Sequence, residues 1–283
     1  MRRLQPARTA DRGSTLLVAL ASVVGLAVYL YPFVLPALNG SVTQSSSTSA
    51  RTGEAPIVLS LLVVLCLGAI LREVDPMRFG EGASKMVALL AALVSIGALS
   101  RLIPSFLGAT PIFLLVILGG YVFGPAFGFQ VGALTLAISA FITGGIGPWV
   151  PYQMLGLGWV GMGAGFLPAL GPGRSRIAVL AVYGVISGML YGVLLNLWFW
   201  PFAMPGGEVA AGLSWSPELG LWETVERYAR FYLVTSAVFD LFRALGNVVL
   251  IVLLARPLLQ TLERYRDRFH WEVWLPESRP EFP

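Results

Sequence analysis

The chain contains uncharged stretches that are too long for a soluble protein of its size. No charged residue occurs from Leu102 to Gly173, and none from Ile177 to Gly207. Charged residues make up only 12% of the sequence, against about 25% in soluble domains. The first stretch alone could hold about three membrane-spanning helices of roughly 20 residues. Lipid, rather than water, is therefore the expected solvent for most of the surface.

These stretches predict helices rather than the strands of a membrane barrel. Lipid offers no hydrogen-bond partners to the backbone, so a spanning segment is either a helix or part of a closed barrel. Barrel strands alternate in polarity over about 10 residues, whereas these stretches are longer and apolar throughout. We predict an all-α integral membrane protein with eight helices, at residues 14–38, 55–71, 85–102, 111–122, 126–143, 149–170, 176–198 and 228–254.

Polar segments divide the predicted helices into regions. Residues 1–72 should form an N-terminal pair of transmembrane helices with a Ser/Thr-rich outer loop, and 73–84 a charged cytoplasmic connector. A six-helix bundle follows at 85–256. The remainder, 257–283, is predicted to be a cytoplasmic tail. Residues 256–269, at the start of that tail, have the pattern of a basic amphipathic helix.

The distribution of Arg and Lys predicts the orientation in the membrane. With a cytoplasmic N-terminus, only four of these residues lie on the outer side of the membrane, namely Arg51, Arg101, Arg227 and Arg230. Most of the others then lie inside, as positively charged loops of membrane proteins usually do. We therefore expect a multi-pass protein of the plasma membrane with both termini in the cytoplasm. This topology also accounts for the basic charge without a nucleic-acid partner.

The sequence lacks recognisable motifs of catalysis and nucleotide hydrolysis. It contains no GxxxxGK[ST], GxSxG or HExxH pattern. The single Cys66 and the single His270 exclude an internal disulfide and a histidine metal cluster. We expect no enzyme activity, cofactor or metal site. The glycines of the segment 156–165 are predicted to let helices pack closely.

Two groups of polar or aromatic residues are candidates for substrate binding. Trp149, Tyr152 and Gln153 follow a Gly-rich turn and offer two aromatic faces and an amide, which suits a flat polar ligand. They are alternatively an interfacial anchor with a helix cap. Asp240 and Arg243 lie one turn apart at membrane depth, where ionisable groups usually pair or face a cavity. They form either a structural ion pair or a ligand contact.

Two further polar residues lie near predicted outer helix ends. Asn196 is a weaker candidate for the substrate site. Arg101 could meet an anionic ligand, or its side chain could extend to the membrane interface. The outer loop 201–226, with its acidic residues and Trp215 and Trp222, is either a lid over the ligand or a variable loop.

Three sequence segments together form a recognisable pattern. The first is the AxxxA pattern of Ala88 and Ala92. The second is VFGPAFGF at 122–129, with GAL at 132–134. The third is GPWVPYQM at 147–154, followed by Gly161 and the Ala-Gly pair at 164–165. Together the segments resemble the substrate-binding S components of energy-coupling factor (ECF) vitamin importers, and the third is most similar to the branch associated with cobalamin uptake.

The resemblance implies a transport function and a set of partners. It implies that the chain binds a vitamin, with cobalamin or a related corrinoid favoured, at its outer face. It also implies docking on a membrane T subunit that is coupled to two cytoplasmic ATPases, with Ala88 and Ala92 on the docking face. The N-terminal helix pair lies outside the six-helix pattern. Two other hypotheses remain, a membrane scaffold or assembly protein and a gradient-driven transporter that uses Asp240 and Arg243.

Overall fold

The computed structural model describes residues 12–39, 56–68, 82–103, 105, 109–202, 212–216 and 218–268. These residues form helices and short turns, with no β-strand among them, which confirms the all-α prediction. The helices are α1 (Arg12–Asn39), an unlabelled helix Pro56–Gly68, α4 (Gly82–Ser100), α5 (Ile112–Phe123), α6 (Pro125–Ile142), α7 (Val150–Gly165), α8 (Arg174–Phe199), η2 (Trp200–Phe202), α9 (Leu221–Thr235) and α10 (Ala237–Arg268).

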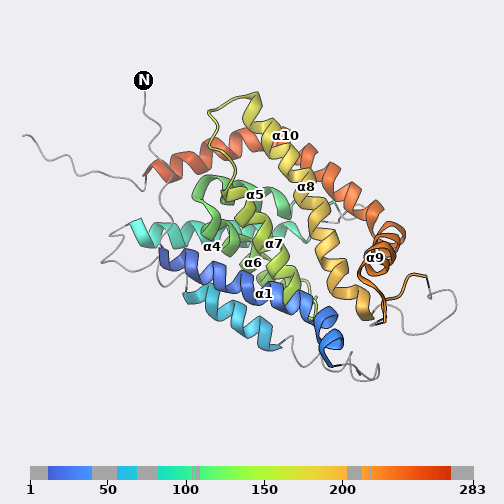
Figure 1. Ribbon diagram of the computed structural model, residues 1–283. Coiled ribbons are helices and arrows are strands. Elements are labelled where there is room, and N and C mark those ends of the chain that lie inside the picture. The colour runs from blue at the N-terminus through green and yellow to red at the C-terminus, as the bar shows by residue number, and fades with distance from the viewer. Residues whose placement is uncertain are drawn as a thin grey trace, which may run out of the picture.

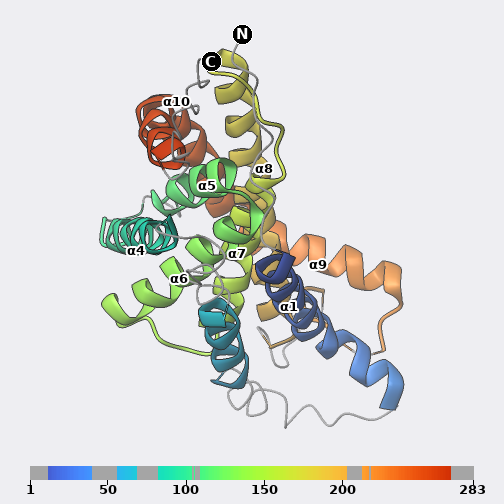
Figure 2. The same ribbon diagram turned by 90° about the vertical axis from the view of Figure 1, so that its left-hand side faces the viewer.

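The helices α5, α6 and α7 form the centre of the molecule. On one side α4 packs against α6, and on another α8 and α10 pack against each other and against α7 and α5. Figure 2 shows α4 and α1 on opposite sides of α6 and α7. In Figure 1 α1 crosses in front of this pair, and the helix Pro56–Gly68 lies beside it.

Glycine residues bring the backbones of the three central helices into direct contact. A Cβ atom on Gly161 of α7 would lie 2.0 Å from the carbonyl oxygen of Gly128 on α6. One on Gly120 of α5 would lie 2.0 Å from the carbonyl oxygen of Gly161, and one on Gly132 would lie 2.3 Å from that of Leu157. The predicted role of Gly161 in close helix packing is confirmed. Side chains at these positions would force the helices apart.

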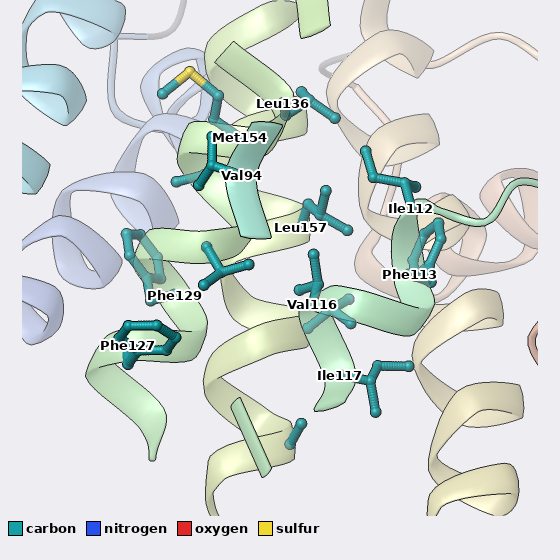
Figure 3. Packing of buried hydrophobic residues seen from close by; sticks show 14 of the residues in the cluster. Val94, Ile112, Phe113, Val116, Ile117, Phe127, Phe129, Leu136, Met154 and Leu157 are labelled. Atoms are coloured by element: carbon teal, nitrogen blue, oxygen red, sulfur yellow. The ribbon is translucent and has the colours of Figure 1, made fainter. Parts of the chain in front are cut away.

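Large apolar side chains fill the space around the glycine contacts. Figure 3 shows this core, to which α4, α5, α6 and α7 all contribute buried residues, among them Val94, Val116, Phe129, Met154 and Leu157. The turn between α5 and α6 also depends on a glycine. Gly124 has a φ of 98° and donates its N–H to the Gly120 carbonyl at 2.8 Å, and Pro125 then begins α6.

Helix α1 is attached to α7 by polar as well as apolar contacts. The Tyr29 hydroxyl donates to the Tyr152 carbonyl at 2.9 Å, and the two rings meet edge to face. The indole N–H of Trp159 donates to Ser22 at 3.0 Å. Gly25 faces Leu155 and Trp159. These contacts make α1 part of the packed body rather than a separate membrane anchor.

The predicted last helix, 228–254, is wrong at both ends. The structure has α9 from Leu221 to Thr235, a break at Ser236, and α10 from Ala237 to Arg268. Part of the predicted outer loop is thus helical, because α9 is amphipathic and has the ion pairs Glu223–Arg227 and Glu226–Arg230 one turn apart. The polar residues of this segment led to its prediction as part of the outer loop 201–226. In turn, α10 continues through Pro257 without a separate tail helix.

The helices differ in their capacity to cross a bilayer. Among the described residues, four helical stretches are long and apolar enough: Gly13–Leu30, Pro125–Ile142, Arg174–Phe199 and Ala237–Asp267. With 12 residues, α5 extends for about 18 Å at 1.5 Å per residue, less than the roughly 30 Å hydrocarbon core. Nine of its residues are buried, so neighbouring helices shield it from lipid. Residues 40–53 of the predicted loop and 73–81 of the predicted connector 73–84 lie outside the described residues, and 82–84 belong to α4.

We predict that Gly161→Val destabilises the bundle. The new side chain would meet the Gly128 carbonyl, which is backbone and cannot turn away, and overpacking of this kind costs about 1–3 kcal/mol or more. Thermal unfolding of the purified protein in detergent measures the effect. Gly171→Val is the matched control, because no atom lies within 4 Å of a Cβ there. Equal melting temperatures for the two variants would contradict the role of Gly161.

Candidate functional site

A cavity lies at one end of the bundle, where α4, α6 and α8 end and α5, α7 and α10 begin. We call this the Trp149 end. The cavity has a volume of about 160 Å³. Its walls come from five of these helices and from the segment before α5, and they combine two guanidinium groups with apolar and aromatic side chains. The lining residues are Arg101, Thr110, Ile112, Phe113, Leu136, Gln153, Leu157, Tyr191, Leu195 and Arg243.

Arg243 reaches this cavity from α10 and is held on three sides. Asp240, one turn earlier, accepts a hydrogen bond from its Nη1 and forms an ion pair with it. The guanidinium lies 5.3 Å from the centre of the Tyr191 ring and 5.9 Å from that of Phe113, within the range of cation–π attraction. The Asp240 side chain is only 2% exposed and is absent from the cavity wall. Asp240 therefore positions Arg243.

A row of glycines on α8 makes room for this arrangement. A Cβ atom on Gly192 would lie 1.7 Å from the Asp240 carboxylate. Gly188 and Gly184 face the following turns of α10, where a Cβ atom would meet Asn247 in both cases. Asn247 on α10 donates its amide to the Gly184 carbonyl at 2.9 Å. The GxxxGxxxG spacing of these glycines was the available signal for close α8–α10 packing, and the sequence analysis missed it.

Arg101 enters the same cavity from the end of α4. Its Nη1 donates to the Ser139 hydroxyl on α6 at 3.0 Å, and its side chain is half-buried. No carboxylate of the described residues forms an ion pair with it. Arg101 therefore lines the same cavity as Arg243.

The aromatic pair predicted beside Gln153 points elsewhere. Gln153 lines the cavity, but successive helix residues differ in direction by about 100°, and Tyr152 is fully buried on another face of α7, between Tyr29 and Trp198. Trp149 precedes the helix, is 42% exposed, and donates its indole N–H to the Gly145 carbonyl at 3.1 Å. The structure brings Gln153 and Arg243 together at the cavity and separates them from Trp149 and Tyr152.

The other predicted binding residue, Asn196, is half-buried near the end of α8 and is not part of the cavity wall. Sequence analysis also missed Phe113, Tyr191 and Thr110 as wall residues. Nothing in their local pattern distinguishes them from ordinary core residues, because only the packing of α5 against α8 and α10 brings them to the cavity.

An aromatic cluster attaches the segment after α8 to the bundle. Trp200 is buried, donates its indole N–H to the Leu213 carbonyl at 2.7 Å, and stacks on Phe33 of α1. Trp215 meets Phe33 edge to face. Trp222, by contrast, is 80% exposed on α9, which lies at the right-hand edge of Figure 1. The two tryptophans predicted for one lid thus have different surroundings.

The AxxxA pattern lies on the open face of α4. Ala88 and Ala92 are both exposed, whereas Leu90 and Leu93 point into the core. Ile96 and Leu99 continue the exposed face by two more turns and are 57% and 54% exposed. This face is on the opposite side of the bundle from α1 (Figure 2). It therefore presents a smooth apolar surface to lipid or to another membrane helix.

We predict that Asp240→Asn lowers the free energy of unfolding by about 3–5 kcal/mol, because it leaves a half-buried guanidinium without its counter-charge. The double variant Asp240→Asn/Arg243→Gln should lose less than Asp240→Asn alone. Thermal unfolding in detergent tests both. Glu226→Gln serves as control, since it removes a pair whose side chains are 49% and 60% exposed and should cost under about 1 kcal/mol. A similar loss in both single variants would contradict the buried role.

Comparisons with known proteins place this architecture in a family. The family model for the ECF transporter, substrate-specific component, matches residues 85–255, which is more than half of the chain. No curated protein and no solved structure matches. Components of this family are membrane-embedded transport subunits rather than enzymes, and they act with a T subunit and ATPase subunits on a substrate. The chain belongs to the family of ECF transporter substrate-specific components.

Proposed function

We propose that the chain captures a vitamin or vitamin precursor in the cavity at the Trp149 end and delivers it through a T subunit and two ATPases. The observation that carries this proposal is the cavity itself, where Gln153, Arg101 and Arg243 converge on an otherwise apolar space. Such a combination of apolar walls and a few polar groups is typical of small-molecule sites.

The proposed direction of uptake follows from the charge distribution. The positive-inside rule places the two termini in the cytoplasm, so the Trp149 end would face outward. Substrate would then enter from outside, between the ends of α4 and α8 and the beginnings of α5, α7 and α10. Trp200 contacts Leu213 and Phe231 and so holds segment 212–216 and α9 at this end of the bundle. Their position supports the proposal that the predicted lid covers the ligand.

The corrinoid prediction depends on the GPWVPYQM segment alone. A corrin macrocycle is larger than a cavity of about 160 Å³, so its binding would require the outer helix ends to separate. The gradient-driven alternative relied on Asp240 and Arg243 as the ion-coupling groups. The burial of Asp240 behind Arg243 favours a positioning role for this pair instead.

We propose that the exposed face of α4 is the docking surface for the T subunit. Ala88 and Ala92 lie one turn apart and leave a shallow surface on which another helix can approach closely. The α1 side of the bundle is less suited, because the helix Pro56–Gly68 contributes its buried residues Leu62, Leu65 and Cys66 to packing there.

The proposed function predicts uptake that requires all partners. Cells that contain the chain, its T subunit and both ATPases should accumulate at least one labelled vitamin or precursor from a panel that includes a corrinoid. Cells that lack the chain or the ATPases should not. Calorimetry of the purified chain with the same panel measures binding separately. A folded sample that binds no member of the panel, in cells that also show no uptake, would refute the proposal.

If the exposed face of α4 is the docking surface, changes on it should affect uptake but not ligand binding. Ala88→Trp/Ala92→Trp should abolish uptake and co-purification with the T subunit, because two indoles would hold the partner helix away from α4. Ligand binding by the purified variant should be unchanged. Ala178→Trp, at an exposed position of α8, is the matched control and should retain uptake. Uptake by the double variant at the normal level would show that docking occurs elsewhere.

A further inference from the structure

The cavity wall carries more positive than negative charge. Of the ten lining residues, Arg101 and Arg243 are cationic, and none is a carboxylate. Asp240 lies behind Arg243 and offsets its charge. Among the described residues, Arg101 donates a hydrogen bond to the neutral Ser139 hydroxyl, and no carboxylate pairs with it. Within the part of the chain that the structure describes, Arg101 is therefore the one positive charge of the wall that no carboxylate compensates.

An uncompensated guanidinium is costly at this position. Ionisable groups at membrane depth are expensive unless a partner or water stabilises the charge. Arg101 is half-buried, and its neighbours in the wall are mainly apolar, among them Ile112 and Leu136. Hydrogen bonds from an ionised donor to an anionic oxygen are roughly twice as strong as neutral ones. A bound anion is the partner that would remove this cost.

The rest of the wall indicates the shape of the ligand. Phe113 and Tyr191 meet edge to face with ring centres 5.2 Å apart, and Leu157 and Leu195 complete an apolar side. Gln153, Thr110 and Tyr191 are the wall residues with neutral hydrogen-bonding groups. A volume of about 160 Å³ is below the roughly 300–1,000 Å³ of pockets for drug-sized ligands. The space suits one ring or a short chain.

We propose that the substrate is a small organic monoanion, with its carboxylate at Arg101 and an apolar ring or short chain against Phe113 and Tyr191. This proposal rests on the proposed uptake function and names its substrate class. Arg243, with its charge offset by Asp240, supplies a second donor and a flat cationic surface. Arg101 thereby sets the selectivity for charge, and the apolar part of the wall sets the selectivity for size.

The test compares acids with amides of the same shape. The probes are pyridine-3-carboxylate with pyridine-3-carboxamide, and hexanoate with hexanamide, each titrated to millimolar concentration into the purified protein in nanodiscs. Calorimetry gives affinities, and the shift in melting temperature gives an independent measure of binding. We expect at least one acid to bind about tenfold or more tightly than its amide. Amides that bind as well as the acids, or acids that do not bind, would overturn the proposal.

Three variants locate the charge preference. Arg101→Gln should abolish the difference between acid and amide, whereas Arg101→Lys should retain part of it. Arg256→Gln removes an exposed cation from the distant half of α10 and should change nothing. If Arg101→Gln does not fold, the comparison of acid and amide in the unaltered protein still decides the question. A full acid preference in folded Arg101→Gln would overturn the assignment to Arg101.

The uptake experiment separates this inference from the function on which it rests. In one outcome, the cells take up a corrinoid or another large neutral vitamin, this uptake depends on the T subunit and ATPases, and the acids do not bind. That outcome would overturn the anion proposal and leave the uptake function intact. Acid binding that depends on Arg101, together with uptake of no labelled compound in complete cells, would refute the uptake function and leave the charge selectivity of the cavity intact.

Discussion

The direct backbone contacts among α5, α6 and α7 determine how the other helices are arranged around them. Gly120, Gly128 and Gly161 allow the three helices to touch without intervening side chains. In lipid, where apolar burial does not drive helices together, such packing is a main source of association. It also fixes the separation of the helix ends that surround the cavity. The position of Gln153 and Phe113 in the wall is therefore a consequence of glycines two or more turns away.

A second level of organisation converts close packing into a charged site. On α8, Gly192 leaves room for the Asp240 carboxylate, and Asp240 holds Arg243 against Tyr191. The small residue makes room for the buried anion, and the anion in turn orients the cation. The arrangement confines Arg243 to one direction in a region where a charged side chain would otherwise turn toward the nearest water. Pre-orientation of this kind reduces the ordering that a ligand must bring about.

The sequence was sufficient to predict features that depend on neighbouring residues alone. Long uncharged runs predicted helices, and α5, α6 and α7 each begin within one residue of the predicted start. Prediction failed where a local pattern had two readings. The first part of α9 resembled a loop, and the stretch 256–269 resembled a separate amphipathic helix, whereas α10 continues through it to Arg268. The cavity was only half predicted, because Gln153 and Arg243 are conspicuous as polar residues, whereas Phe113 and Tyr191 acquire their role only from contacts between distant helices.

The attachment of α1 has a consequence for motion in the membrane. The hydrogen bonds from Tyr29 to the Tyr152 carbonyl and from Trp159 to Ser22 involve the stretch of α1 that is long and apolar enough to cross a membrane, where lipid offers no replacement for either partner. Breaking them to release α1 would be unfavourable, so α1 travels with α7. Any tilting of the bundle during a transport cycle would displace the lipid around α1 as well. The resulting body is broader than six helices, and the viscous resistance of the bilayer to its reorientation is correspondingly greater.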